Sequence, residues 1–146
     1  MGGRRKSREL ALQALFYFDY DKGDPDRLLP LFCENFSDIM NHGAVPFFKT
    51  LVKGVKSKQS DIDRLINTCS RNWKVPRMPA VDRNIMRIGV FEFVECPDIP
   101  SSVTINEAVE IGKRFGTRDS ASFINGVLDR VRIQMESEQE TQGGLF

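Results

Sequence analysis

Residues 80–96, AVDRNIMRIGVFEFVEC, are apolar around nearly the whole circumference of a helix. Their main polar strip consists of Arg83 and Arg87, which lie one helical turn apart. A helix that is apolar on almost every side is normally buried among other elements. This segment is therefore predicted to be the central helix of the fold.

The segments on either side of this helix supply amphipathic partners for it. A T-I-N-E sequence at Thr104 to Glu107 has the pattern of a capping box, although that helix can also begin at Pro100. Ser60 is expected to cap one helix and Gly116 to end another as a C′ glycine. No segment alternates with a period of two, so the fold is predicted to be all-α with about seven helices. The six segments with apolar residues at helical spacing are 10–18, 27–40, 47–55, 60–69, 104–115 and 119–135.

Prolines and polar runs suggest how these helices are organised. WKVPRMP, residues 73–79, holds prolines that cannot lie inside a helix. They mark a seam between an N-terminal helical half, residues 1–76, and a C-terminal helical half, residues 77–135. Residues 136–146, ESEQETQGGLF, contain few core-forming side chains and are predicted to be a frayed, flexible acidic tail.

Charge is distributed unevenly along the 146 residues. The whole chain has 21 Lys and Arg against 20 Asp and Glu, yet four of the cations lie within the first eight residues, which hold no acid. The remainder is mildly acidic. Cys33, Cys69 and Cys96 are far apart, which disfavours disulfides and zinc and suits a reducing cytoplasm. No run approaches the ~20 apolar residues of a membrane span.

The sequence favours binding over catalysis. It contains none of the GxxxxGK[ST], GxGxxG, HExxH or GxSxG patterns, which begin nucleotide, dinucleotide, zinc-protease and acyl-transfer sites. The single histidine, His42, has no nucleophile beside it and is expected to be a solvated loop residue. We therefore expect no catalytic residues, no metal and no cofactor.

Two segments have features of an RNA-binding surface. The cations Arg4, Arg5, Lys6 and Arg8 lead into a helix on which Arg5 and Phe16 share one strip. Cations bind phosphates and exposed rings stack on unpaired bases, at ~1–3 kcal/mol per base. The alternative is a solvated cationic tail with Phe16 in the core.

The second segment is FGTRDSASFING, residues 115–126, where a helix start combines with Phe123 at the edge of an apolar face. Amides at a helix start favour phosphate, and an edge aromatic suits a base. The alternative is ordinary capping by Asp119 with Phe123 buried.

Three stretches together resemble the NusB family of bacterial transcription antitermination factors. The resemblance runs from Arg4 to about Val131, although residues 19–75 match mainly in helical pattern. The last of the stretches is the most specific. They are RRKSRELALQALF (4–16), DRNIMRIGVFEF (82–93) and IPSSVTINEAVEIGKRFGTRDSASFINGVLD (99–129).

The resemblance implies two antiparallel helical halves and a family function. Members of the family bind boxA-type single-stranded RNA together with the ribosomal protein NusE, and they help RNA polymerase pass terminators. By resemblance, the RNA-binding residues are Arg4, Arg5, Lys6, Arg8, Phe16, Asp119 and Phe123. Phe16 replaces the family's usual Tyr, which keeps a stacking face but loses a hydroxyl.

Two further residues match positions related to the partner protein. Asp82 matches a position that faces NusE, and a mildly acidic body suits a very basic ribosomal protein. Arg87 either joins that partner surface or braces the buried helix, and bracing is favoured. If the four N-terminal cations neutralise about four phosphates on a single strand, log K should fall with log salt at a slope near −3.

Other functions remain open at this stage. One alternative is a helical protein-interaction module or homodimer whose cationic start only aids solubility. The chain can also be the NusB-like domain of an RNA methyltransferase, which requires a longer protein with a methyl-donor domain. An enzyme acting on RNA is the least favoured of these hypotheses.

Overall fold

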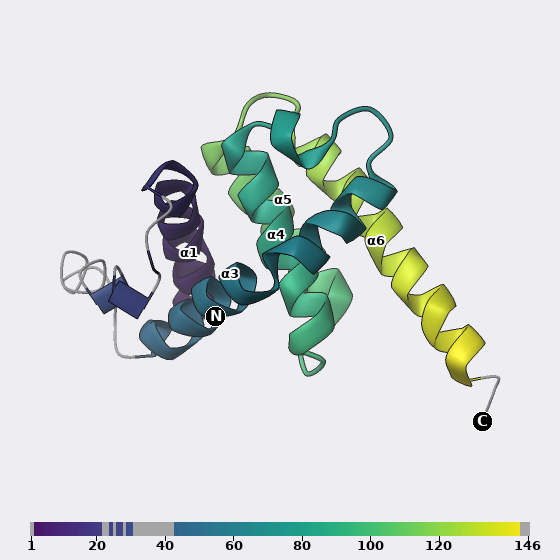
Figure 1. Ribbon diagram of the computed structural model, residues 1–146, viewed down its shortest axis with the longest axis horizontal. Helices are drawn as coiled ribbons and strands as arrows, with labels where there is room; N and C mark the ends of the chain where they lie inside the picture. Colours follow the sequence, from purple (N-terminus) through teal and green to yellow (C-terminus); the bar gives the residue numbers. More distant parts are fainter. Residues whose placement is uncertain (1, 22–23, 25, 28, 31–42, 144–146) are drawn as a thin grey trace.

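The computed structural model describes residues 2–21, 24, 26, 27, 29, 30 and 43–143 (Figure 1). Within these ranges the fold is all-α, as predicted, and no strand is present. A short 3-10 turn, η1, spans Val75–Arg77. The five α-helices bounded within these ranges are α1 (Gly2–Asp21), α3 (Ala44–Cys69), α4 (Ala80–Glu95), α5 (Ser101–Phe115) and α6 (Ser120–Gly143).

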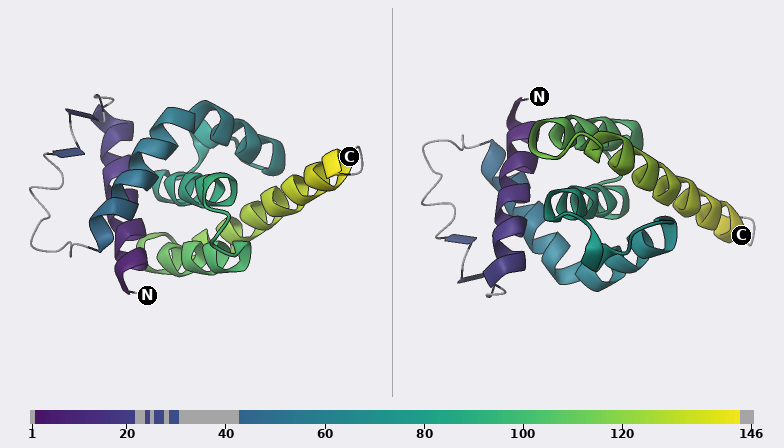
Figure 2. Two further views of the ribbon diagram at one scale, coloured as in Figure 1. Left: turned by 90° about the horizontal axis from the view of Figure 1, so that it is seen from below. Right: turned by 90° about the horizontal axis from the view of Figure 1, so that it is seen from above.

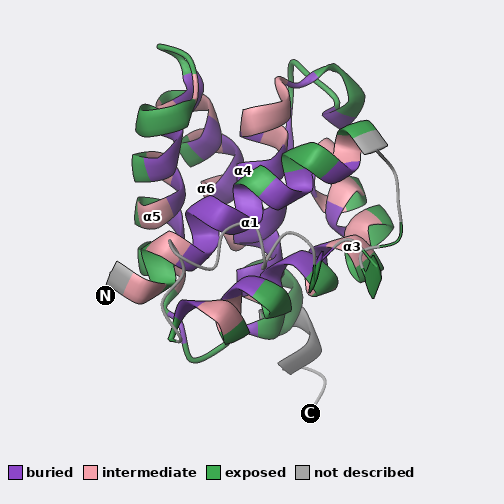
Figure 3. Ribbon diagram, turned by 90° about the vertical axis from the view of Figure 1, so that its left-hand side faces the viewer, coloured by how far each residue is buried: buried purple, intermediate pink, exposed green. Residues whose placement is uncertain are grey.

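Helix α4 is the centre of the molecule, as its apolar circumference predicts. It contacts α1, α3, α5 and α6, and it is buried along most of its length (Figure 3). Met86 and Val90 are completely buried on it. The prolines at 97 and 100 follow its end at Glu95, which is consistent with their inability to continue a helix.

The other helices surround α4 in two groups. Helix α1 packs on α3 and α4 and runs crosswise to α4 (Figure 2). Helices α5 and α6 form a hairpin joined by residues 116–119. One continuous apolar cluster includes residues from all five helices, so the proline-rich connection between α3 and α4 does not separate two cores.

The structure corrects the predicted number of helices. The segments 47–55 and 60–69 form one helix, α3, because residues 56–59 contain no Gly or Pro. Only Lys58 leaves helical geometry, with φ −113° and ψ 15°, so the helix bends there and does not end. Ser60 is consequently inside a helix and not an N-cap. The helix expected over 27–40 lies mostly outside the described residues, as do Cys33 and His42.

Helix ends also differ from the sequence-based predictions. Helix α5 begins at Ser101, so the capping box at Thr104 is wrong and the alternative start near Pro100 is correct. Gly116 is the C-cap with extended backbone, φ −95° and ψ −164°, and not a left-handed C′ residue. A side chain there would collide with Ser120 and with the Gly112 carbonyl, so close packing requires the glycine.

The C-terminal helix is longer than predicted. Helix α6 continues to Gly143, across residues that we expected to be frayed. Glu and Gln in this segment have good helix propensity, which permits a helix without a core to pack on. Its last turns project beyond the other helices (Figures 1 and 2).

Membrane and metal sites can be assessed in the described ranges. No helix there is both long and apolar enough to cross a bilayer. Among the same residues, no group of His, Cys, Asp and Glu side chains is arranged to hold a metal ion. Cys69 and Cys96 are buried thiols, and burial raises the pKa of each.

Two glycines within helices test the packing of α3 on α4. A methyl group at Gly54 would overlap the Phe91 ring, whereas one at Gly126 would meet only the flexible end of Arg130 at 3.9 Å. We expect Gly54→Ala to cost about 1–3 kcal/mol of unfolding free energy through overpacking. Gly126→Ala should gain about 0.5–1 kcal/mol from reduced chain entropy. Urea unfolding followed by circular dichroism measures both, and equal effects would contradict the close α3–α4 contact.

Candidate nucleic-acid interface

The cationic start of the chain is the first part of helix α1. Arg4 and Arg5 are exposed on it and Lys6 is partly exposed. Arg4 lies 3.7 Å from Asp98, in an ion pair whose two side chains are mostly exposed. Arg5 is held more closely, because its Nε donates to Oε2 of Glu107 at 2.8 Å. Three of the four predicted RNA-binding cations are therefore accessible.

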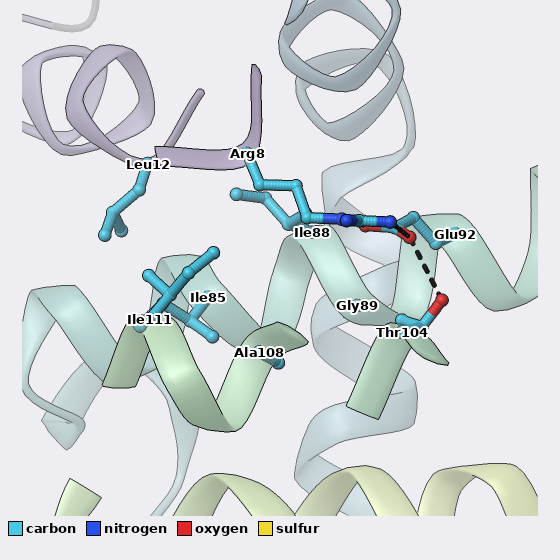
Figure 4. Close-up of a pocket in the computed structure, with 9 residues that line it drawn as sticks. All are labelled: Arg8, Leu12, Ile85, Ile88, Gly89, Glu92, Thr104, Ala108 and Ile111. Carbon is cyan, nitrogen blue, oxygen red and sulfur yellow. Dashed lines mark hydrogen bonds and ion pairs between the residues drawn. The ribbon is translucent and has the colours of Figure 1, made fainter. Parts of the chain in front are cut away.

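Arg8 is the exception, and its position corrects the prediction. Its side chain is only 3% exposed and donates twice to Glu92 of α4, Nε to Oε2 and a terminal nitrogen to Oε1, both at 2.8 Å. Thr104 of α5 donates to the same carboxylate at 3.0 Å. Figure 4 shows Arg8 reaching from α1 to Glu92. Arg8 therefore joins three helices and is not available to bind phosphate.

The cavity beside this pair does not suit a ligand. It has a volume of about 10 Å³, which is roughly the space for one water molecule. Arg8, Glu92 and Thr104 line it together with apolar side chains of α1, α4 and α5 (Figure 4). It is a packing gap next to a buried ion pair.

Two acids of the α1–α5 contact neutralise the surrounding arginines. Glu107 accepts from Arg5 and also lies 3.7 Å from Arg8. Glu9, nearly buried on α1, accepts from the exposed Arg114 of α5 at 2.9 Å. Arg4, Arg5 and Arg114 therefore already have carboxylate partners that phosphates would have to replace.

Phe16 lies on the surface, so the alternative that places it in the core is wrong. Its ring is 46% exposed, on the helix that begins with the arginines. Tyr17 and Tyr20 are also exposed, at 48% and 89%, and sequence analysis did not single them out. The helical pattern could have identified both. Tyr17 lies between the core positions Leu15 and Phe18, and Tyr20 lies beyond Phe18, so neither falls on the apolar face.

The second predicted segment forms the start of α6. Asp119 is exposed and immediately precedes the helix. The buried Ser120 hydroxyl accepts from the Thr117 amide at 2.8 Å and so holds the turn before the helix. Phe123 is partly buried and contacts the ring of Trp73 edge-on, with centroids 5.6 Å apart. Asp119 and Phe123 therefore lie together on the surface at one helix start.

Asp82 does not face a partner in this structure. It is 3% exposed and accepts from the Ser120 hydroxyl at 2.7 Å. Burial raises the pKa of Asp82, and the hydrogen bond from Ser120 opposes part of that rise. The predicted partner contact is corrected, because this carboxylate instead ties α4 to the start of α6.

Arg87 braces the buried helix, as the favoured interpretation has it. It is 5% exposed, and it donates to both oxygens of Asp63 at 2.8 and 2.9 Å. A further nitrogen donates to Asp19 at 3.1 Å. Arg87 thus joins α4 to α3 and α1, and its placement on a partner surface is wrong.

The fold and the exposed surface of α1 and α6 together define the general class of this protein. This is an all-α protein that presents arginine and aromatic side chains on α1 and a further aromatic ring at the start of α6, and buried ion pairs join its helices. The sequence model of the NusB family matches residues 5–132. The chain therefore belongs to the NusB family.

Relatives named as transcription antitermination protein NusB match nearly the whole chain. The protein of Desulforapulum autotrophicum is 63% identical over 133 residues, which cover 91% of this chain and 93% of the relative. The protein of Desulfatibacillum aliphaticivorans is 51% identical over 142 residues, which cover 97% and 98%.

Solved structures share the fold. NusB of T. maritima matches with a TM-score of 0.80 and 35% identity, over 88% of this chain and 89% of that one. A chain from the crystal structure of the antitermination factors NusB and NusE in complex with double-stranded RNA matches with a TM-score of 0.81 and 25% identity. That match covers 92% of this chain and 98% of the other.

Replacing Arg8 tests its role as a buried anchor. Arg8→Ala leaves Glu92 charged and unpaired in the interior, so we expect a loss of about 3–5 kcal/mol in unfolding free energy. Arg8→Met combined with Glu92→Leu should recover much of this loss. Arg4→Ala, on the exposed side of the same turn, should change stability by less than about 0.5 kcal/mol. Urea unfolding of the wild type and these three variants measures the effects. Equal losses of stability in Arg8→Ala and Arg4→Ala would mean that Arg8 is exposed like Arg4.

Asp19 provides a pH-dependent test of the Arg87 network. Burial acts to raise the pKa of Asp19, but Asn84, Arg87 and Arg83 outweigh it and lower the pKa. A lowered folded-state pKa stabilises the fold above the unfolded value, near ~3.9, and that stability is lost as pH falls through the folded pKa. The stability difference between wild type and Asp19→Asn should therefore be largest at neutral pH and shrink in acid. A constant difference across a pH series would contradict this charge pairing.

Proposed function

We propose that this protein is a cytoplasmic transcription antitermination factor. It binds boxA-type single-stranded RNA together with the ribosomal protein NusE and promotes processive transcription of ribosomal RNA operons by RNA polymerase. The observation that carries the proposal is the accessible Arg4, Arg5 and Lys6 start of α1 in a chain that belongs to the NusB family. The solved relative, held with NusE and double-stranded RNA, supports NusE and RNA as partners, and the preference for a single strand is part of the proposal.

The accessible side chains divide between strand positioning and base contacts. Arg4, Arg5 and Lys6 engage phosphates, which position an RNA strand without reading its sequence. Phe16 and Phe123 offer rings on which unpaired bases stack. An exposed carboxylate such as Asp119 cannot bind phosphate, but it can accept a hydrogen bond from a base amino group.

The carboxylate partners of the arginines make RNA binding an exchange reaction. Phosphate must displace Glu107 from Arg5 and Asp98 from Arg4, so the gain per contact is smaller than for free guanidinium groups. With Arg8 buried, three cations are available and not four. For a single strand, the expected slope of log K against log salt therefore changes from about −3 to about −2. A second protein surface such as NusE then supplies the remaining affinity.

Fluorescence anisotropy of a labelled boxA-type RNA over a salt series tests the proposal. A scrambled strand and a duplex serve as competitors, with and without NusE. We expect preference for the boxA-type single strand, strengthened by NusE. Equal binding of boxA and scrambled strands without any effect of NusE, or no binding, would instead favour a helical interaction module.

Charge variants test the exchange of carboxylate for phosphate. Arg5→Ala should weaken binding and reduce the salt slope by about 0.7. Glu107→Gln removes the competing charge and should tighten binding by up to about fivefold. Arg132→Ala, which removes an arginine paired with Asp129 and Glu136 on its own helix, is the matched control and should bind like wild type. Weaker binding by Glu107→Gln would contradict the exchange.

A further inference from the structure

The connection between α3 and α4 carries an unusual concentration of positive charge. From residue 64 to residue 81 the chain has four cations and no Asp or Glu. Arg71 and Arg77 are exposed in this connection. Trp73, the only tryptophan of the chain, lies between them and is 47% exposed. Exposed indole beside guanidinium groups is a pairing that suits single-stranded nucleic acid.

The backbone around Trp73 is firmly held. The Ser70 hydroxyl donates to the Trp73 carbonyl. The side chain of Asn67, in the last turns of α3, accepts from the Val75 amide at 2.8 Å. The Lys74 ammonium donates to the Asn67 backbone carbonyl at 2.9 Å, so this cation is engaged with the C-terminal end of α3. A ligand that binds here therefore loses little affinity to the ordering of the loop.

Trp73 also continues a surface on which RNA binding is already proposed. Its ring meets Phe123 at an interplanar angle of 67°, so two aromatic rings from distant parts of the sequence adjoin. Arg130 of α6 donates to the Cys69 carbonyl at 2.8 Å and holds α6 against the end of α3. The Trp73 and Phe123 rings are therefore fixed relative to each other.

We propose that Trp73, Arg71 and Arg77 form an additional contact for single-stranded RNA that extends the surface at Phe123. The indole stacks on an unpaired base, and the two guanidinium groups engage neighbouring phosphates. This inference rests on the proposed function. The connection, residues 70–79, holds three cations and no acid. It therefore repels a very basic ribosomal protein, so charge favours RNA over NusE as the occupant.

Intrinsic fluorescence tests the contact directly, because Trp73 is the only tryptophan. A boxA-type single-stranded RNA is titrated into the wild-type protein, with and without NusE, and Trp73→Phe with the same additions provides the blank. Stacking should quench the emission with the same midpoint that anisotropy gives for RNA binding. NusE alone should leave the emission unchanged.

Variants supply a second, independent measurement. Trp73→Leu should weaken RNA binding by roughly five- to 150-fold, the equivalent of one lost base stack, and Trp73→Phe should retain most of the affinity. The two added phosphate contacts steepen the expected wild-type salt slope from about −2 to about −3.5, and Arg71→Ala with Arg77→Ala should remove that increase of about 1.4. Arg64→Ala, in the same stretch but paired with Asp61, is the control and should bind like wild type. Thermal melts confirm that each variant is folded.

The possible outcomes separate this inference from the proposed function. If RNA binds without changing the tryptophan emission, and Trp73→Leu binds RNA as tightly as the wild type, this inference is wrong while the proposed function stands. Quenching by NusE without RNA also overturns it, since the surface is then a protein contact. Absence of any RNA binding by the wild type removes both proposals together.

Discussion

The buried ion pair between Arg8 and Glu92 determines how the first helix sits on the rest of the molecule. Apolar packing alone lets a helix rotate or slide at modest cost, whereas a bidentate guanidinium–carboxylate contact accepts one geometry. Thr104 adds α5 to the same contact. Because Arg8 lies two residues after Lys6 on the same helix as Arg4, Arg5 and Lys6, this pair fixes the direction in which those three side chains leave the surface. The buried ion pair thus positions the three accessible cations.

Arg87 has the same role farther toward the start of α4. Its contacts with Asp63 and Asp19 join α4 to α3 and α1. A helix as apolar as α4 has few features that define its rotation in a hydrophobic core, and its buried Arg87 and Glu92 provide them. The charges that interrupt the apolar sequence of this helix therefore specify its orientation, while its apolar residues provide the core itself.

Apolar periodicity was sufficient to predict the all-α fold and the central helix, because burial of each helix face is a local property of the sequence. It did not reveal the partners of buried charges. Glu92 lies 84 residues beyond Arg8, so an arginine in a cationic run gave no sign that it is internal. Asp82 and Ser120 present the same difficulty. The single bend at Lys58 was also beyond prediction, since a polar run without Gly or Pro is compatible with a continuous or an interrupted helix.

Helix α6 continues past the core, and this separates the two ends of the described chain. The arginine-bearing start of α1 lies against the body of the protein, while the last turns of α6 project away from it (Figure 1). An affinity tag or fluorophore placed at the end of α6 would stand clear of the α1 surface (Figure 1). The same group placed at the first residues of α1 would lie close to Arg4 and Arg5. The helix that carries the label therefore determines whether the α1 surface stays accessible to a ligand or is blocked by the label.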